Sequence, residues 1–185
     1  MVSVSAGAGG SNAITGVIST LVARNTVKAT SREHVTISVK KASGSSANDT
    51  DPLPGVYIEA HDNTELLNLA GALSAAGSVG AGATVVALVF NKTVTAETGK
   101  EHKILAPGKV QVIADAKDNL WLLAVNFAAG GSAGVAGGAN ALVFQNHITS
   151  ALGGIVGDAR NSVQSVKVSA NSDSSLYNLA AAAGI

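Results

Sequence analysis

Hydrophobic and polar residues alternate in five segments of the chain: Val56–Ala60, Val110–Ala114, Val166–Ala170, Ala83–Ala96 and His34–Val39. In the first three, Val, Ile or Ala stands at every second position, which predicts β-strands with one buried face. The segment Ala83–Ala96 is rich in Val and Thr, whose branched side chains favour strands over helices. His34–Val39 alternates in the same way, with its Val and Ile residues on one face.

Two further segments, Asn63–Gly77 and Ser172–Gly184, fit either secondary structure. A Thr or Ser cap followed by Leu and Ala at helical spacing would suit an amphipathic helix. A glycine cluster follows the first segment at once, however, and both faces of the two segments are apolar. Apolar residues on both faces are typical of strands that are buried on both sides, so we favour strands here.

The chain repeats itself, which is the signature of a repeat architecture. Val56–Ala60 recurs as Val110–Ala114, 54 residues later, and a third copy starts at Val166, a further 56 residues on. The N-terminal part aligns with the following copy at an offset of 67 residues. A polar insert at Ser43–Gly55 accounts for that extra length.

These observations predict an all-β fold, a parallel β-solenoid (β-helix) built from about three repeats of 54–67 residues. Each repeat should contain several short strands and form two or three coils. Residues 1–185 make up a single repeat array, with phases that start near Val56, Val110 and Val166. Because Met1 and Ile185 fall at nearly the same phase, we interpret the chain as a segment of a longer array whose terminal edges associate end to end.

The composition excludes several functions. Charged residues make up 13% of the chain, against about 25% in typical proteins, and 12 basic residues balance 12 acidic ones. Nucleic-acid binding needs an excess of clustered Lys and Arg, so we expect no nucleic-acid partner. The absence of cysteine excludes disulfides and thiolate metal sites. The first residues lack a signal sequence, so export would depend on a signal elsewhere in a longer parent.

Two long runs carry almost no charge. Leu66–Phe90 has no charged residue, and Leu120–Gly157 has a single titratable one, His147. Their length would admit a membrane span. They are rich in Gly, Ala and Ser rather than Leu and Phe, and they recur in register with the strand pattern. We therefore favour buried strand pairs and do not expect membrane insertion.

No set of residues shows catalytic spacing, so we expect neither an enzyme nor a cofactor. Glu33-His34 and Glu101-His102 recur at related positions and could stack as a ligand pair on adjacent coils. The third copy has Ala159-Arg160 at that place, so the set is incomplete. Polar residues at the corner of a coil explain these histidines better than a metal site does.

Acidic and amide residues also cluster in three places: His61–Asn63, Asp115–Asn119 and Asn171–Asp173. Calcium would require several closely spaced oxygen ligands. A lysine stands inside one cluster, and Asn and Asp commonly shape solvated turns. We therefore interpret the clusters as turns and predict no metal site.

The insert Ser43–Gly55 is the candidate recognition loop, because it has no counterpart in the next copy and because loops on rigid scaffolds commonly carry recognition. Its Ser, Gly, Asn, Asp and Pro content marks a surface loop, although a tolerated insertion without a role is the alternative. The candidate recognition residues are Ser43, Ser45, Asn48, Asp49 and Asp51.

The copies resemble the repeats of a known family. Asp62–Ala72 continues into a Gly/Ala-rich stretch and then Ala87–Thr93, a pattern similar to large filamentous adhesins. These are the filamentous-haemagglutinin-like and leukotoxin-like surface proteins of Gram-negative-type bacteria. The resemblance covers nearly the whole chain and rests on a pattern rather than on an invariant motif. It implies secretion to the bacterial cell surface, a parallel β-solenoid shaft, and a stalk or adhesive role without catalytic residues.

The partners expected on this basis are a host-cell or matrix surface ligand, or other copies of the chain joined end to end. Two other classes of protein stay open. A phage tail fibre or self-assembling fibril would share the solenoid. A membrane-inserting or pore-forming module would share the uncharged runs.

Overall fold

The computed structural model describes residues 1–40, 53–160 and 162–185, and within them every regular element is a β-strand. The strands are β1 (Val2–Gly9), β2 (Asn12–Thr30), β3 (Thr36–Ser38), β4 (Val56–Ala76), β5 (Val79–Glu97), β6 (Lys103–Leu105), β7 (Lys109–Gly130), β8 (Ala133–Ala151), β9 (Ile155–Val156) and β10 (Ser165–Gly184). The prediction of an all-β chain is confirmed.

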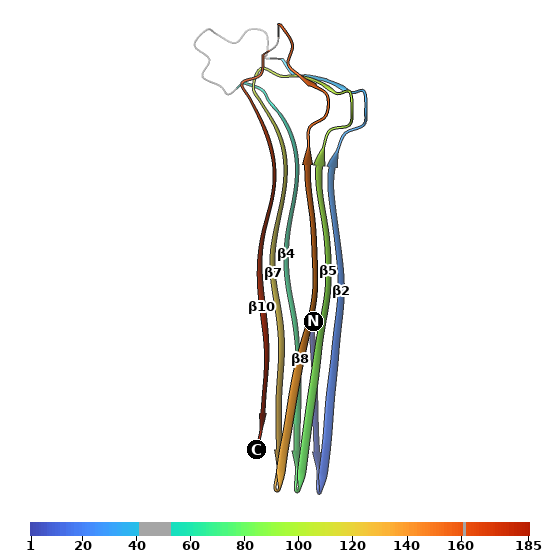
Figure 1. Cartoon of the computed structure of the whole chain (residues 1–185), viewed down its shortest axis with the longest axis vertical. Helices are drawn as coiled ribbons and strands as arrows, with labels where there is room; N and C mark the ends of the chain where they lie inside the picture. The colour runs from blue at the N-terminus through green and yellow to red at the C-terminus, as the bar shows by residue number, and fades with distance from the viewer. Residues whose placement is uncertain (41–52, 161) are drawn as a thin grey trace.

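The strands form three parallel sheets, ordered β1-β4-β7-β10, β2-β5-β8 and β3-β6-β9. The first two sheets lie face to face as two layers of long strands, and the short third sheet lies at one end of the molecule (Figure 1). β7, with 22 residues, is about 70 Å long at 3.3 Å per residue. The protein is therefore a flat, elongated stack of coils, a parallel β-solenoid in architecture.

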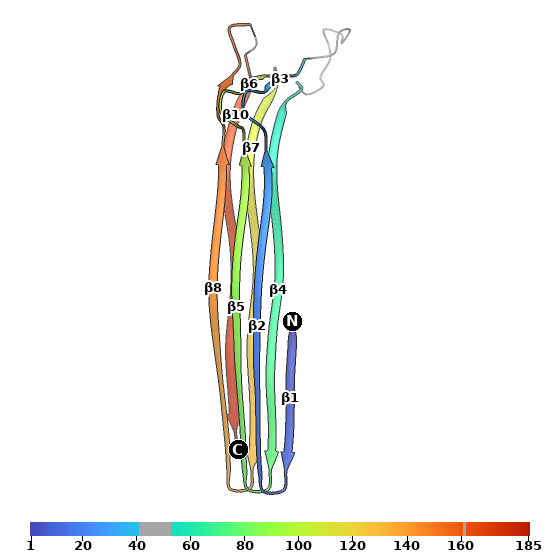
Figure 2. The same cartoon turned by 90° about the vertical axis from the view of Figure 1, so that its right-hand side faces the viewer.

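Each repeat makes one coil. The chain runs down a strand of the first layer, turns, runs up a strand of the second layer, and passes through a short third strand to the next coil (Figure 2). The expectation of several short strands and of two or three coils per repeat is wrong. The alternation of inward and outward residues continues without a break through each long segment, so one strand spans what looked like several.

The register of the ladders follows the sequence repeat. Val56 lies opposite Val110, and Val110 lies opposite Val166. The two segments that fitted either helix or strand lie within β4 and β10, so the preference for strands there is confirmed. In the core columns, identical or similar side chains stack on one another, as for Leu88 on Leu142 and Phe90 on Phe144, so each repeat helps to bury the next.

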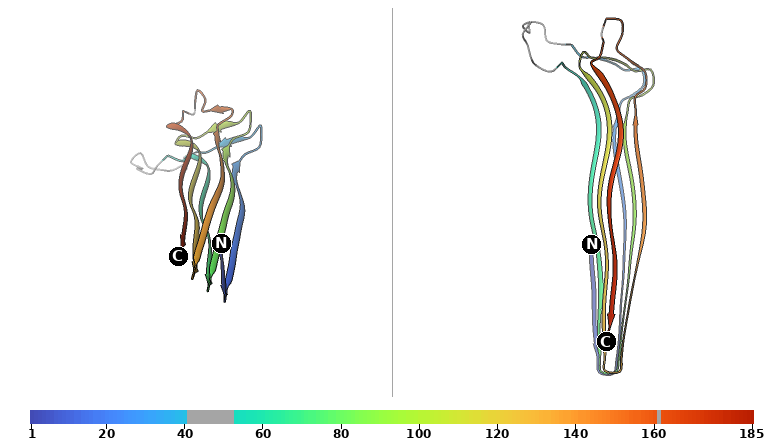
Figure 3. Two further views of the ribbon diagram at one scale, coloured as in Figure 1. Left: turned by 60° about the horizontal axis from the view of Figure 1, so that its bottom comes forward. Right: turned by 60° about the vertical axis from the view of Figure 1, so that its left-hand side comes forward.

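The turns that join the two layers also stack, and they require glycine. A side chain at Gly77 would overlap the carbonyl oxygen of Gly10, and one at Gly131 would overlap the carbonyl oxygen of Gly77. An added carbon at Gly10 itself would meet nothing within 4 Å, because no coil lies beyond it among the described residues. All of these turns lie at the same end of the long strands (Figure 3).

The core lies between the two layers and consists of three apolar clusters. The largest contains Val86, Leu88, Phe90, Leu120 and Leu122, each at most 1% exposed. A second cluster centres on residues 94, 96, 112 and 114, and a third lies beside the short sheet around residues 104, 106 and 110. Leu142 and Phe144, which align with Leu88 and Phe90, lie on the edge strand β8 and are only partly buried.

The half of each long strand that lies next to these turns is here called the distal half. It comprises residues 2–22, 67–89, 121–143 and 177–184. Its outward positions are apolar and exposed, as for Ile14 (85%) and Ile18 (78%). Its inward positions include polar side chains such as Ser19 and Asn68, which hydrogen-bond to each other at 2.7 Å. The expectation that these strands are buried on both sides is therefore wrong, because no third layer covers the outer faces in the described structure.

Candidate functional site

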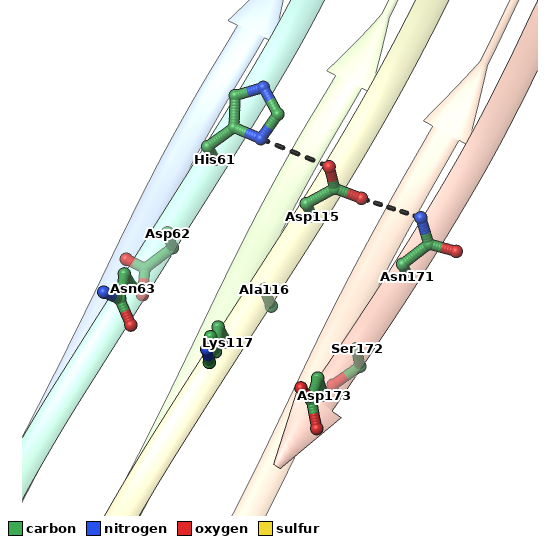
Figure 4. A pocket seen from close by; sticks show the side chains of 9 residues that line it. All are labelled: His61, Asp62, Asn63, Asp115, Ala116, Lys117, Asn171, Ser172 and Asp173. Carbon is green, nitrogen blue, oxygen red and sulfur yellow. Dashed lines mark hydrogen bonds and ion pairs between the residues drawn. The ribbon is translucent and has the colours of Figure 1, made fainter.

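The outer face of the β4-β7-β10 sheet carries a shallow groove of about 540 Å³ (Figure 4). Its lining residues come from equivalent positions on the three strands: His61, Asp62 and Asn63; Asp115, Ala116 and Lys117; and Asn171, Ser172 and Asp173. These are the three clusters noted in the sequence. They lie in the middle of long strands, so their interpretation as solvated turns is wrong.

One row of the groove is linked by side-chain contacts across all three coils. His61 Nδ1 lies 3.3 Å from Asp115 Oδ2, and Asn171 Nδ2 donates a hydrogen bond to Asp115 Oδ1 at 2.8 Å. The next outward row contains Asn63, Lys117 and Asp173. The groove therefore offers imidazole, carboxylate, amide and ammonium groups to a polar ligand.

An aromatic row borders the groove on its distal side. Trp121 of β7 stacks on Tyr177 of β10, with ring centroids 4.0 Å apart and planes 16° from parallel. Leu67 of β4 completes the row. The two rings cover each other on one face, and the other face of Tyr177 is open toward the free edge of β10. A further aromatic or apolar side chain added at that edge would continue the row.

A second polar site lies inside the stack and was missed in the sequence. Lys92 of β5 is fully buried and forms ion pairs with Asp62 of β4 and, at 2.5 Å, with Asp118 of β7. Asn25 and Asn146 occupy the positions equivalent to Lys92 in the neighbouring coils. We call these five residues the internal polar column.

Donors and acceptors alternate along this column. Asn25 Nδ2 lies 3.4 Å from Asp62 Oδ2, and Asn146 Nδ2 donates to Asp118 Oδ2 at 2.8 Å. Each carboxylate therefore bridges two donors from successive coils. A lysine at an inward position of an alternating strand was the available sequence signal, since Lys92 lies two residues from Phe90 and two from Val94.

The internal polar column lowers the pKa of one of its carboxyl groups, that of Asp62. Burial raises the pKa of the Asp62 carboxyl, but hydrogen bonds from Lys92, Thr64 and Asn25 and the charge of Lys92 outweigh that effect. The net result is a pKa below the ordinary value of 3.8. Asp62 is therefore ionised at neutral pH, as an ion pair with a buried lysine requires.

The other histidines do not form a ligand pair. His34 lies opposite Glu101, with 2.9 Å between its Nδ1 and Glu101 Oε2, because the register there is 67 residues rather than 68. His102 is buried, and its Nε2 contacts the carbonyl oxygen of Arg32 and, at 3.1 Å, Ser31 Oγ. The sequence alignment of the two Glu-His pairs is thus wrong by one residue.

The candidate recognition residues Ser43, Ser45, Asn48, Asp49 and Asp51 lie outside the described residues. Over the ranges that are described, no group of three or more His, Cys, Asp or Glu side chains is placed to hold a metal ion.

Comparisons with protein-family models, with curated protein sequences and with solved structures found no match. In the described part of the chain, no helix has the length and apolar character needed to cross a membrane.

Proposed function

We propose that this chain is a shaft segment of a secreted bacterial surface filament or adhesin, with a structural and adhesive role and no catalysis. The observation that supports the proposal most is the in-register stacking of three coils through two long parallel ladders. A stack of this kind can be extended indefinitely by adding coils, and each added coil repeats the same outer surface.

The free edges support association with further coils. β8 and β10 are edge strands at one end of the stack, and β1 and β2 are edge strands at the other. The buried Asn140 Oδ1 and Asn146 Oδ1 have no hydrogen-bond partner among the described residues. Both residues lie on the edge strand β8, so a further strand added at that edge could supply the missing donors.

Electron microscopy and sedimentation test the shaft. With increasing concentration, the chain should form ribbons about 70 Å wide, the length of a strand, that lengthen by about 4.8 Å per coil. Strict monomers at all concentrations would refute end-to-end stacking.

Attachment assays test the adhesive role. The purified chain should bind host cells or matrix-coated surfaces, and replacing Ser43–Gly55 by the short turn Ala106-Pro107-Gly108-Lys109 should reduce that binding. Far-ultraviolet circular dichroism of the same variant must show an unchanged strand content. Full retention of binding would remove the loop from the recognition surface, and no binding by the parent chain would refute the adhesive role.

The distal half favours a second candidate, a membrane-inserting or pore-forming module. Its outward apolar rows extend over about nine residues per strand, or roughly 30 Å, the thickness of a bilayer's hydrocarbon core. On one face these rows include Val85, Val89 and Val143, and on the other Leu73 and Phe127, all more than a third exposed. Such contiguous apolar surface is uncommon on monomeric soluble proteins.

Dye leakage from liposomes separates the two candidates. Leakage that is caused by the parent chain and abolished by Val89→Asp would favour the membrane module, because the substitution places a charge in the outward apolar rows. The matched variant Asn91→Asp, two residues away in the outward polar row, should leak as the parent does. Intact liposomes together with ribbon formation would favour the shaft.

A further inference from the structure

The centre of the internal polar column combines an amine and two carboxyl groups in a dry environment. The side chains of Lys92 and Asp118 are 0% exposed, and that of Asp62 is 10% exposed. Large apolar side chains flank the group: the Lys92 Nζ lies 5.5 Å from the centre of the Phe90 ring, and Leu120 is buried two residues from Asp118. The neighbouring coils carry asparagine at the position of Lys92, so the buried cation belongs to this coil alone among the described residues.

Low polarity changes the chemistry of such a group. An amide forms from a neutral amine and a neutral carboxylic acid, and proton transfer from an ammonium to a carboxylate that contacts it produces both forms. In water this condensation is unfavourable, whereas a site that excludes water favours loss of a water molecule.

We propose that Lys92 and Asp118 become joined by an intramolecular isopeptide bond, and that Asp62 carries the proton during its formation. The inference concerns covalent chemistry inside the stack, and it does not depend on the proposed function.

The hydrogen bonds identify Asp118 as the acceptor of the bond. Asp118 Oδ1 contacts the Lys92 Nζ at 2.5 Å, while Oδ2 receives hydrogen bonds from Asn146 Nδ2 at 2.8 Å and Ser174 Oγ at 3.2 Å. Those two donors would stabilise the negative charge that grows on Oδ2 when the carboxyl carbon is attacked. Asp62 Oδ1 also contacts the Lys92 Nζ, so it is placed to take a proton from that nitrogen.

The step balances without an oxidant or a co-reactant. Lys92 enters as an ammonium and Asp118 as a carboxylate. Asp62 transfers one proton from the Lys92 Nζ to Asp118 Oδ1, and the lone pair of the neutral amine then attacks the carboxyl carbon of the neutral acid. The bond from that carbon to Oδ1 breaks, and Oδ1 leaves as water with the two protons that the nitrogen lost, one of them delivered by Asp62. An amide remains, and Asp62 is again ionised.

Intact mass spectrometry of the folded and then denatured chain tests the proposal. The mass should be lower than the sequence mass by one water molecule, and digestion should yield a branched peptide that joins Lys92 to Asp118. Lys92→Met and Asp118→Ala should each have their full sequence mass. Lys117→Met, which removes an exposed lysine next to Asp118, is the matched control and should still lose one water.

Each other outcome counts against the proposal. A parent chain with its full sequence mass would overturn it, as would a water loss without a branched peptide, for example through a succinimide. A branch from Lys92 to Asp62 would overturn the assignment of the acceptor. Asp62→Asn should slow bond formation after refolding by about 100-fold or more, as is typical when general acid–base catalysis is lost. An unchanged rate would overturn the proton-carrying role of Asp62.

Discussion

Leu88 and Val89 are adjacent in β5 and point to opposite sides of the sheet. Leu88 is 1% exposed within the largest core cluster, and Val89 is 37% exposed on the outer face. Substituting each residue therefore tests directly which face of the long strand is buried. The two positions are well matched, because both lie in β5 between the same neighbouring strands, β2 and β8.

The expected magnitudes differ widely. Leu88→Ala removes a fully buried side chain and leaves a cavity beside Phe90 and Leu120. It should lower the free energy of unfolding by about 3 kcal/mol, in a range of roughly 2–5 kcal/mol. Leu88→Asp also buries an unpaired charge, so its cost should be a large part of the roughly 5–15 kcal/mol by which a typical domain is stable. Val89→Ala should cost less than about 1 kcal/mol, since little area is lost.

Urea denaturation, followed by the fluorescence of the single tryptophan, measures these differences. Trp121 lies on the outer face of β7 against Tyr177, so its emission should report the loss of the stack without being altered by changes at Leu88. Leu142→Ala, at the equivalent position of the edge strand, should cost less than Leu88→Ala because Leu142 is only partly buried. If Leu88→Ala and Val89→Ala have the same stability, the assignment of the inner face is refuted.

Three further outcomes can be measured. Far-ultraviolet circular dichroism should be dominated by strand, and a mostly helical spectrum would contradict the fold. Gly77→Ala should destabilise the stack by several kcal/mol, since a methyl group would meet the Gly10 carbonyl oxygen, whereas Gly10→Ala should have little effect by thermal denaturation. The contribution of Asp62 to the unfolding free energy should be fully present above its ordinary pKa of 3.8 and be lost as the pH falls toward its lowered pKa in the folded state. Asp62→Asn should therefore flatten the pH dependence in that window, and an equally steep profile would show that Asp62 is not responsible.

Much of the fold could be predicted from the sequence because the repeat and the strand alternation agree. The alignment of Val56 with Val110 and Val166 is the ladder register itself. The prediction of which face of His34–Val39 turns toward the core was also correct, because Ile37 and Val39 pack against the third core cluster. The length of the strands was not predicted, because polar residues such as Asp62 looked like the end of a strand.

The candidate site was harder to predict, since its residues are far apart along the chain. His61, Asp115 and Asn171 were noted separately, but only the parallel register places them in one row of a groove. The internal ion pairs required knowledge of both layers. Lys92 has no acidic neighbour in its own strand before Glu97, and its partners come from the facing sheet.

The sequence by itself determined that the chain is a stack of parallel strands, because similar side chains recur at a fixed period and alternate with a period of two. It did not determine which side of each strand faces inward in the distal half, where one side is almost entirely apolar and the other mixes apolar residues with polar ones such as Ser19 and Asn68. The tertiary structure decided that question. Two layers can bury only the faces turned toward each other, so the polar side chains that pair across the gap lie inside and the remaining apolar rows stay exposed.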